Sequence, residues 1–192
     1  MEALFTSTAV VTLAEIGDKT QLLAILLATR FKRPLPIILG ILVATLANHA
    51  LAALLGAQAA AFLDSDIFRY VIGASFVAMA AWTLIPAKFE DDDAPKSHAG
   101  AFMTTLVAFF LVEMGDKTQV ATIALGARFH DVFTVTAGTT LGMMIANVPA
   151  IFLGHELLKR VDLNKVRMIA AALFLVIGLW VLAQTAGLFG AG

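Results

Sequence analysis

Cysteine is absent from this chain of 192 residues, and charged side chains are scarce. Without cysteine the chain can form neither disulfide bonds nor thiolate metal sites, and cysteine usage gives no information on the redox compartment. Charged residues make up 14% of the chain and hydrophobic residues 60%, against about 25% charged and about 45–50% apolar in typical soluble domains. The net charge of −1 gives no electrostatic argument for binding nucleic acid. The composition therefore indicates an integral membrane protein.

A basic leader that ends in a small-residue cleavage site is also missing from the start of the chain. The first apolar run begins almost directly after Met1 and Glu2, so we expect no cleavable signal peptide. The first apolar segment is therefore expected to remain as a membrane span.

Long apolar segments take up most of the chain. Most of them reach the ~20 residues that a helix needs to cross about 30 Å of hydrocarbon. The short alternating segments of a β-barrel are absent, and a helix satisfies its own backbone in lipid. The sequence therefore predicts an all-α integral membrane protein with six transmembrane helices, at residues 4–28, 35–58, 67–86, 101–126, 132–157 and 166–188.

The two halves of the chain are repeats related by a shift of 98 residues, with no gap across three segments. Agreement at several rare residue types favours duplication of a three-helix unit. We therefore expect a first three-helix repeat at 1–86, an acidic cytoplasmic linker at 87–100 and a second three-helix repeat at 101–192. The shift superposes Glu15 on Glu113, Asp18 on Asp116, Gly40 on Gly138, Gly56 on Gly154, Arg69 on Arg167, Phe76 on Phe174 and Trp82 on Trp180.

A unit of three spans crosses the membrane an odd number of times, so the second unit must enter from the opposite side, as an inverted repeat. The positive-inside rule tests the orientation. With the N-terminus outside, the outer connections carry only Arg69 and Arg128. We therefore expect a multi-pass protein whose two termini are both periplasmic or extracellular. The cytoplasmic connections then carry nine basic residues, Arg30, Lys32, Arg33, Lys88, Lys96, Lys159, Arg160, Lys165 and Arg167.

One heptapeptide with two carboxylates and a lysine occurs in both halves, at residues 15–21 and 113–119. Charges inside an apolar segment are costly and usually mark a functional site. On a continuous helix Glu15 and Asp18 share one face, which Gln21 extends. The glycine between the carboxylates could also let the helix unwind locally, which would free carbonyl oxygens as ligands.

Antiparallel repeats can bring the two motifs together at similar depth. We predict that their acids, Glu15, Asp18, Glu113 and Asp116, form one metal-binding site. A site built from oxygen ligands suits a hard divalent cation such as Mg²⁺, Ca²⁺ or Mn²⁺. Candidates for additional ligands or gating groups are Lys19, Thr20, Gln21, Asn48, Lys117, Thr118, Gln119 and Asn147.

Asn48, Asn147 and His49, which the repeat shift places on Asn147, are polar residues within apolar segments. They could complete the coordination shell, but interhelical hydrogen bonding is the more common role of such residues. Small residues at four-residue spacing let helix backbones approach closely, so two such stripes are predicted to pack on the motif helices. The stripes are Gly40, Ala44, Asn48, Ala52 and Gly56, and Gly138, Gly142, Ala146, Ala150 and Gly154.

The predicted site has two uncompensated negative charges, because it holds four carboxylates and two lysines. One divalent cation or two protons would neutralise it, and competition between metal and protons for the same carboxylates is the minimal chemistry of an antiporter. A structural alternative exists, because Glu15 and Lys19, like Glu113 and Lys117, have the spacing of ordinary helix salt bridges. In an intermediate case the lysines neutralise or gate the site while the carboxylates bind the ion.

The doubled motif resembles the signature of a family of small cation/proton antiporters, Glu-apolar-Gly-Asp-Lys/Arg-Thr/Ser, with one copy in each three-helix half. Both copies match it fully, at residues 15–20 and 113–118. The family includes bacterial manganese exporters of the MneA type and the Golgi manganese/calcium transporters of eukaryotes. The resemblance implies that the four carboxylates bind the transported ion and that inward proton flow drives export.

The resemblance also implies a secondary transporter, not an enzyme, that exports Mn²⁺ or, as the alternative, Ca²⁺, and needs no prosthetic group. The short chain without an organellar presequence resembles bacterial members. The expected location is therefore the inner (plasma) membrane, and the expected partners are the metal ion, protons and the lipid bilayer. The residues alone leave open a divalent cation channel and, with less support, a metal-dependent intramembrane enzyme, for which we find no nucleophile constellation.

Overall fold

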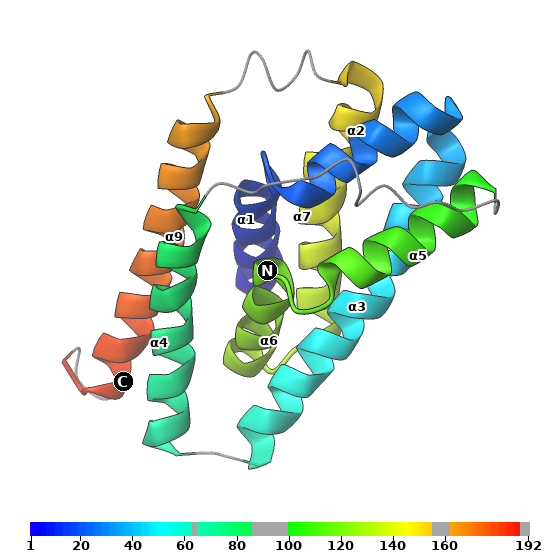
Figure 1. Cartoon of the computed structure of the whole chain (residues 1–192). Helices are drawn as coiled ribbons and strands as arrows, with labels where there is room; N and C mark the ends of the chain where they lie inside the picture. Colours follow the sequence, from blue (N-terminus) through cyan, green and yellow to red (C-terminus); the bar gives the residue numbers. More distant parts are fainter. Residues whose placement is uncertain (63–64, 86–99, 155–161, 189–192) are drawn as a thin grey trace.

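Helices account for all the regular structure in the computed structural model, which describes residues 1–62, 65–85, 100–154 and 162–188 (Figure 1). These ranges contain no strand, so the prediction of an all-α protein is confirmed. Residues 87–99 of the predicted linker lie outside the described residues. The described helices are α1 (Glu2–Glu15), α2 (Lys19–Phe31), α3 (Pro34–Phe62), α4 (Asp66–Thr83), α5 (Ala101–Glu113), α6 (Lys117–Phe129), α7 (Val132–Leu153) and α9 (Leu163–Thr185).

Three of the described helices, α3, α7 and α9, are long and apolar enough to cross a membrane on their own. The segments predicted as single spans at 4–28 and 101–126 are instead each divided, into α1 and α2 and into α5 and α6. Their parts have 13 or 14 residues, which is short of the ~20 that one span needs. A single continuous helix is therefore wrong at both places, and the alternative of local unwinding at the motif is the one that the structure shows.

Each break falls on the glycine of the motif. Gly17 and Gly115 both have a φ of 78°, a left-handed conformation that is costly for residues with a Cβ. The next residues, Asp18 and Asp116, are extended, with ψ of 170° and 164°. The expectation that Glu15 and Asp18 share a helix face is therefore wrong, because Glu15 ends α1 and Asp18 precedes α2.

The glutamine of each motif accepts a hydrogen bond from the backbone of the glycine at the break. The backbone N–H of Gly17 donates to Oε1 of Gln21 at 2.8 Å, and that of Gly115 donates to Oε1 of Gln119 at 2.7 Å. A broken helix at membrane depth leaves backbone groups that must find partners inside the protein. The motif thus supplies both the residue that breaks the helix and a side chain that satisfies the freed backbone.

Helices α3 and α7, the second predicted span of each half, pack against the broken helices of the opposite half. α3 crosses α5 and α6, and α7 lies along α1 (Figure 1). A Cβ on Gly56 of α3 would clash with the carbonyl oxygen of Ile123, and one on Gly142 of α7 would lie 2.7 Å from that of Thr8. The predicted packing of the small-residue stripes on the motif helices is confirmed, although Gly154 has no such neighbour within 4 Å among the described residues.

Helices α4 and α9, the third predicted span of each half, lie side by side (Figure 1). Their backbones approach closely where a Cβ on Gly178 would lie 2.9 Å from the carbonyl oxygen of Gly73. The rings of Phe76 and Phe174 meet in the same contact, with centroids 6.2 Å apart and planes tilted by 36°. Phe76 and Phe174 are related by the 98-residue shift, so the two halves meet here through corresponding residues.

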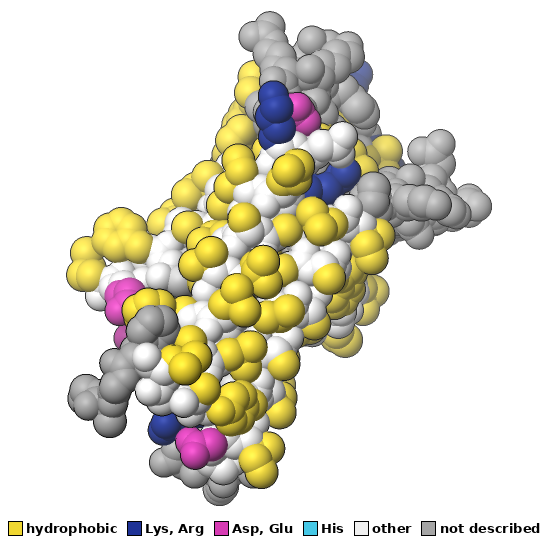
Figure 2. Space-filling model, turned by 90° about the vertical axis from the view of Figure 1, so that its left-hand side faces the viewer, with side chains coloured by type: hydrophobic (Ala, Val, Ile, Leu, Met, Phe, Trp, Pro, Cys, Tyr) yellow, Lys and Arg dark blue, Asp and Glu magenta, His cyan; other side chains and the backbone are white. Residues whose placement is uncertain are grey.

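The outer side of α4 and α9 is a broad apolar surface (Figure 2). Met168, Ile169, Val176 and Leu179 of α9 are each more than half exposed. A contiguous apolar surface of this extent is unusual on a soluble monomer. It fits contact with lipid, in agreement with the composition of the chain.

The close approach at Gly56 predicts a specific intolerance to added volume. Gly56→Ala places a methyl group against the backbone of α6, and overpacking of this kind costs typically about 1–3 kcal/mol. We expect a lower unfolding temperature for the detergent-purified variant, measured by differential scanning fluorimetry. Leu55→Ala is the matched control, because Leu55 is 62% exposed on the same helix. Equal unfolding temperatures for Gly56→Ala and the wild type would contradict the packing described here.

Candidate ion-binding site

The four motif acids lie at the helix breaks and are buried. Glu15 and Glu113 are the last residues of α1 and α5, and both are fully inaccessible. Asp18 and Asp116 directly precede α2 and α6 and are 5% and 6% exposed. Glu15, Glu113 and Asp116 each offer one carboxylate oxygen, and these oxygens lie within 4.8 Å of one another. Carboxylates from both halves of the chain thus converge on one place.

The motif lysines pair with aspartates of the opposite half. Nζ of Lys117 lies 2.7 Å from Oδ1 of Asp18, and Nζ of Lys19 lies 3.1 Å from Oδ1 of Asp116. The alternative of local salt bridges between Glu15 and Lys19, and between their counterparts, is therefore wrong. The side chain of Lys117 is 10% exposed and that of Lys19 is 33% exposed, so the two pairs differ in their access to solvent.

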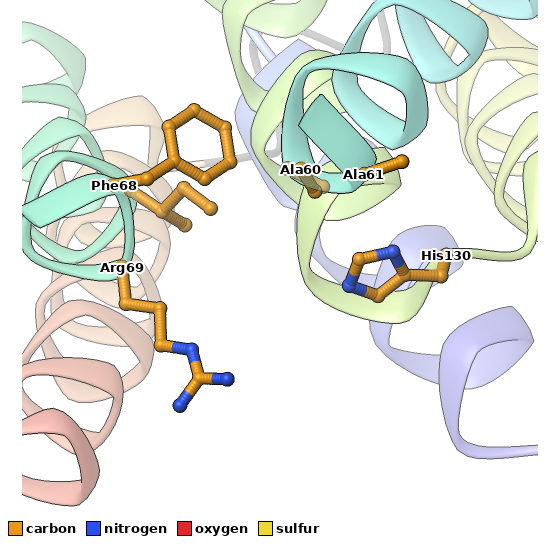
Figure 3. A pocket seen from close by; sticks show the side chains of 7 residues that line it. Ala60, Ala61, Phe68, Arg69 and His130 are labelled. Atoms are coloured by element: carbon orange, nitrogen blue, oxygen red, sulfur yellow. The ribbon is translucent and has the colours of Figure 1, made fainter. Parts of the chain in front are cut away.

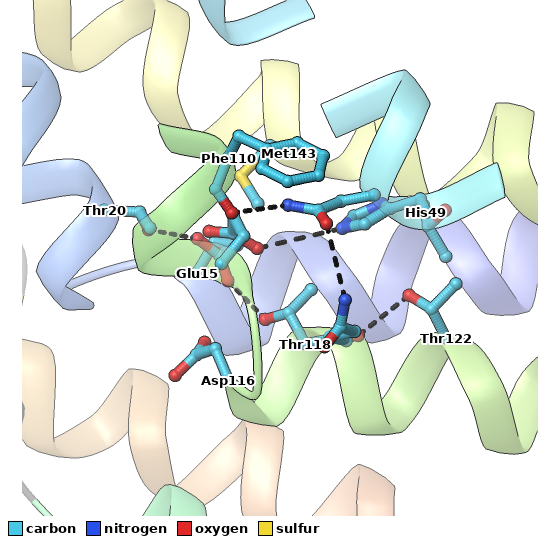
Figure 4. A network of polar contacts seen from close by, with 12 residues as sticks. Glu15, Thr20, His49, Phe110, Asp116, Thr118, Thr122 and Met143 are labelled. Carbon is cyan, nitrogen blue, oxygen red and sulfur yellow. Dashed lines mark hydrogen bonds and ion pairs between the residues drawn. The ribbon is translucent and has the colours of Figure 1, made fainter. Parts of the chain in front are cut away.

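The two glutamates differ in their hydrogen bonding. The hydroxyl groups of Thr20 and Thr118 each donate to one carboxylate oxygen of Glu15, one from each half of the chain (Figure 4). Both oxygens of Glu113 are buried without a hydrogen-bond partner among the described residues. Leaving a buried carboxylate unpaired costs far more than leaving it in water. Glu113 is therefore the part of the cluster in most need of a ligand.

Three of the predicted amide residues make structural contacts between the halves. The Nε2 of Gln21 donates to the carbonyl oxygen of Ala146 at 2.8 Å. Gln119 donates to Oδ1 of Asn48 at 3.4 Å, and Asn48 donates in turn to the carbonyl oxygen of Phe110 at 2.9 Å. Interhelical hydrogen bonding, the alternative to coordination, is thus the observed role of Asn48.

Asn147 and His49, which the repeat shift superposes, lie in different environments. Asn147 donates to the carbonyl oxygen of Met143 on its own helix at 3.0 Å, and its Oδ1 is buried without a partner among the described residues. Nε2 of His49 lies 3.8 Å from Oε2 of Glu113, and both residues are fully buried. The sequence offered His49 as a possible member of the coordination shell, and the packing of α3 on α5 brings it to Glu113.

A separate pocket of about 290 Å³ opens between the ends of α3, α4 and α6 (Figure 3). Phe68, Arg69 and His130 are among its lining residues. It lies at the end of α6, whereas the motif lies at the start, and the 13 residues of α6 span about 20 Å. The pocket is therefore distinct from the carboxylate cluster.

The donor set of the cluster is made of carboxylate oxygens, and no cysteine exists to supply a thiolate. Oxygen ligands suit Mg²⁺, Ca²⁺ and Mn²⁺. Carboxylates must lose any proton before they bind a metal, so a cation and protons compete for the same oxygens. A buried cluster of this kind can therefore exchange one for the other.

Comparisons with known proteins agree with this chemistry. A family model described as "Divalent cation/proton antiporter GDT1" matches residues 3–91 and 101–188, that is, both halves of the chain. A protein of Vibrio cholerae named "Putative manganese exporter" is 48% identical over 180 residues, which cover 93% of this chain and 90% of the relative. A GDT1-like protein of Synechocystis is 30% identical over 85% of this chain and 88% of its own length.

A more distant relative, GDT1-like protein 5 of Arabidopsis thaliana, is 26% identical over 90% of this chain and 92% of its own length. No solved structure gives a significant match. The family consists of transporters, so the enzyme alternative is set aside. The matched residues include both motifs, whose acids and lysines build the buried cluster. The chain is therefore a membrane protein of the GDT1 family of divalent cation/proton antiporters.

Proposed function

We propose that this antiporter exports Mn²⁺ across a bacterial inner membrane in exchange for protons, with the ion held by the motif carboxylates. The observation that carries the proposal is the buried convergence of Glu15, Glu113 and Asp116 from the two halves. The choice of Mn²⁺ is supported by the 48% identical relative, whose name refers to manganese export. Ca²⁺, which also takes oxygen ligands, is the second candidate.

We propose that all four motif acids contribute an oxygen to the ion, with Asp18 joining the three acids whose oxygens lie within 4.8 Å of one another. Lys117 occupies Oδ1 of Asp18 and Lys19 occupies Oδ1 of Asp116, but Oδ2 of each aspartate is buried without a partner among the described residues. The lysines thus hold the aspartates in place and leave one oxygen of each available. We assign the four carboxylates as ligands, with Thr20 and Thr118 orienting Glu15.

The charge balance of the site supports an exchange of one divalent ion for two protons. Each motif lysine is paired with an aspartate, and neither lies in an ion pair with Glu15 or Glu113. Two glutamates thus remain to be neutralised in a buried site. One divalent cation or two protons provide the same compensation, and the cost of buried unpaired charge disfavours the site that holds neither.

The repeats provide the two-sided access that an antiporter needs. We propose six membrane crossings in two inverted units, residues 1–86 and 101–192, joined by a cytoplasmic linker, with α1–α2 and α5–α6 each acting as one broken crossing. Discontinuous helices at the midplane are typical of inverted-repeat transporters. The reciprocal pairing of Lys19 with Asp116 and of Lys117 with Asp18 supports a two-fold relation between the units.

The experiment that tests the function is metal uptake into proteoliposomes with an acidic interior, at clamped membrane potential. We expect the outward proton gradient to drive Mn²⁺ uptake, and a protonophore to abolish it, because metal and protons compete for one set of carboxylates. Uptake that persists unchanged with the protonophore would contradict exchange and favour a divalent cation channel.

The same vesicles test the ligand assignment. We expect Glu15→Gln, Asp18→Asn, Glu113→Gln and Asp116→Asn each to lower proton-driven Mn²⁺ uptake at least about tenfold, since even groups that only support a metal site are worth about 10–100-fold. Glu2→Gln is the matched control, because Glu2 is an exposed acid in the first turn of α1. Normal uptake by all four variants would show that the ion binds elsewhere.

Reporter fusions test the proposed orientation. The nine basic residues of the proposed cytoplasmic connections support an orientation with both termini outside. A reporter that is active only in the cytoplasm should be silent when fused after Gly192, and active when inserted within the linker at 87–100. Strong activity of the fusion at Gly192 would contradict the inverted arrangement of the two units.

A further inference from the structure

His49 is the one fully buried histidine among the residues that the structure describes, and neither of its ring nitrogens has a hydrogen-bond partner there. It lies near the middle of α3, within an apolar helix that is long enough to span a membrane. A buried imidazole normally has its nitrogens satisfied, because an unsatisfied polar group costs about 1–3 kcal/mol. A histidine left without partners at this depth calls for an explanation.

The ring points at the carboxylate cluster (Figure 4). Its Nε2 lies 3.8 Å from Oε2 of Glu113, which also lacks a hydrogen-bond partner among the described residues. At 3.8 Å the two atoms are too far apart for a direct hydrogen bond. Ligand atoms about 2.0–2.6 Å from one metal ion are separated from each other by about 3–4.5 Å. The spacing of Nε2 and Oε2 therefore fits two ligands of one ion.

The other half of the chain offers no equivalent nitrogen. The residue superposed on His49 is Asn147, and its amide nitrogen donates to the carbonyl oxygen of Met143 and is 2.9 Å from the sulfur of that residue. Glu15, the counterpart of Glu113, has both oxygens occupied by threonine hydroxyls. The site is thus asymmetric, with an open carboxylate and an open imidazole on the same side.

We propose that His49 is a direct ligand of the transported ion, beside Glu113, and that its nitrogen selects a transition metal over Ca²⁺ and Mg²⁺. The inference rests on the proposed function, because the ion is the one that the carboxylates carry. Ca²⁺ and Mg²⁺ bind through oxygen, whereas an imidazole adds affinity for first-row transition ions. An all-oxygen site would lack this contribution of nitrogen to selectivity, so one residue of α3 would shift the preference toward transition metals.

The direct test is electron spin echo envelope modulation of Mn²⁺ bound to the purified protein in detergent. The chain has four histidines, so protein made with ¹⁵N-histidine reports on imidazole coordination. We expect a nitrogen coupling in the unlabelled wild type that changes in the labelled protein. Bound Mn²⁺ with no coupling sensitive to the label would overturn the proposal, and this measurement needs no variant.

Variants then assign the nitrogen to His49. His49→Gln should lose the coupling and lower the apparent affinity for Mn²⁺ in vesicle uptake about tenfold or more, the order of loss seen when a metal site is perturbed. Uptake of Ca²⁺ should change much less. His130→Gln is the matched control, because His130 lines the separate pocket at the far end of α6. It should keep both the coupling and the metal preference.

The outcomes separate the two proposals. A His49→Gln variant that keeps the coupling, or that loses Mn²⁺ and Ca²⁺ uptake to the same extent, would overturn the role of His49 while the proposed function stands. A wild type that binds no Mn²⁺ and shows no proton-driven uptake would overturn the proposed function itself.

Discussion

The compensation of buried charge is the constraint on which the site depends. Four carboxylates and two lysines lie at the breaks of two helices, and each lysine pairs with an aspartate of the opposite half. Such crossed pairs join the two halves at the site and leave Glu15 and Glu113 without a lysine. Buried carboxylates are stable only when a cation or protons neutralise them. The pairing that joins the halves therefore leaves two glutamates whose charge a transported ion or protons can neutralise.

The backbone at the site separates the two acids of each motif. The left-handed glycines turn the chain between the glutamate and the aspartate, whereas a continuous helix would keep both acids on one helix. The glutamines accept hydrogen bonds from the glycine N–H groups, so the break leaves neither of these N–H groups unpaired. The close approach of α3 at Gly56 and of α7 at Gly142 then fixes both breaks against the other half.

Much of this arrangement could be predicted from the sequence, because hydropathy, the 98-residue repeat and the doubled motif are local or periodic signals. The all-α class, the stripes of small residues and the convergence of acids from both halves follow from them. The breaks could not be predicted with certainty, since a glycine is tolerated inside a helix at a cost of about 1 kcal/mol. The partners of Lys19 and Lys117 could not be predicted, because the local spacing offers each lysine a glutamate on its own segment and the sequence gives no sign of the aspartate of the opposite half. The sequence marked His49 as a polar residue in an apolar segment, but its contact with Glu113 comes from tertiary packing, which no sequence pattern reports.

The central claim is that one divalent ion and two protons are alternative occupants of the same pair of glutamates. Calorimetric titration of the purified protein with Mn²⁺, in buffers of different ionisation enthalpy, counts the protons released on binding. Metal binding must release any protons held by its ligands, so we expect the number released to rise toward about two per ion as the pH is lowered, while the affinity for Mn²⁺ falls. Glu15→Gln and Glu113→Gln should each release about one proton fewer. Binding of Mn²⁺ with no proton release at any pH would contradict the account.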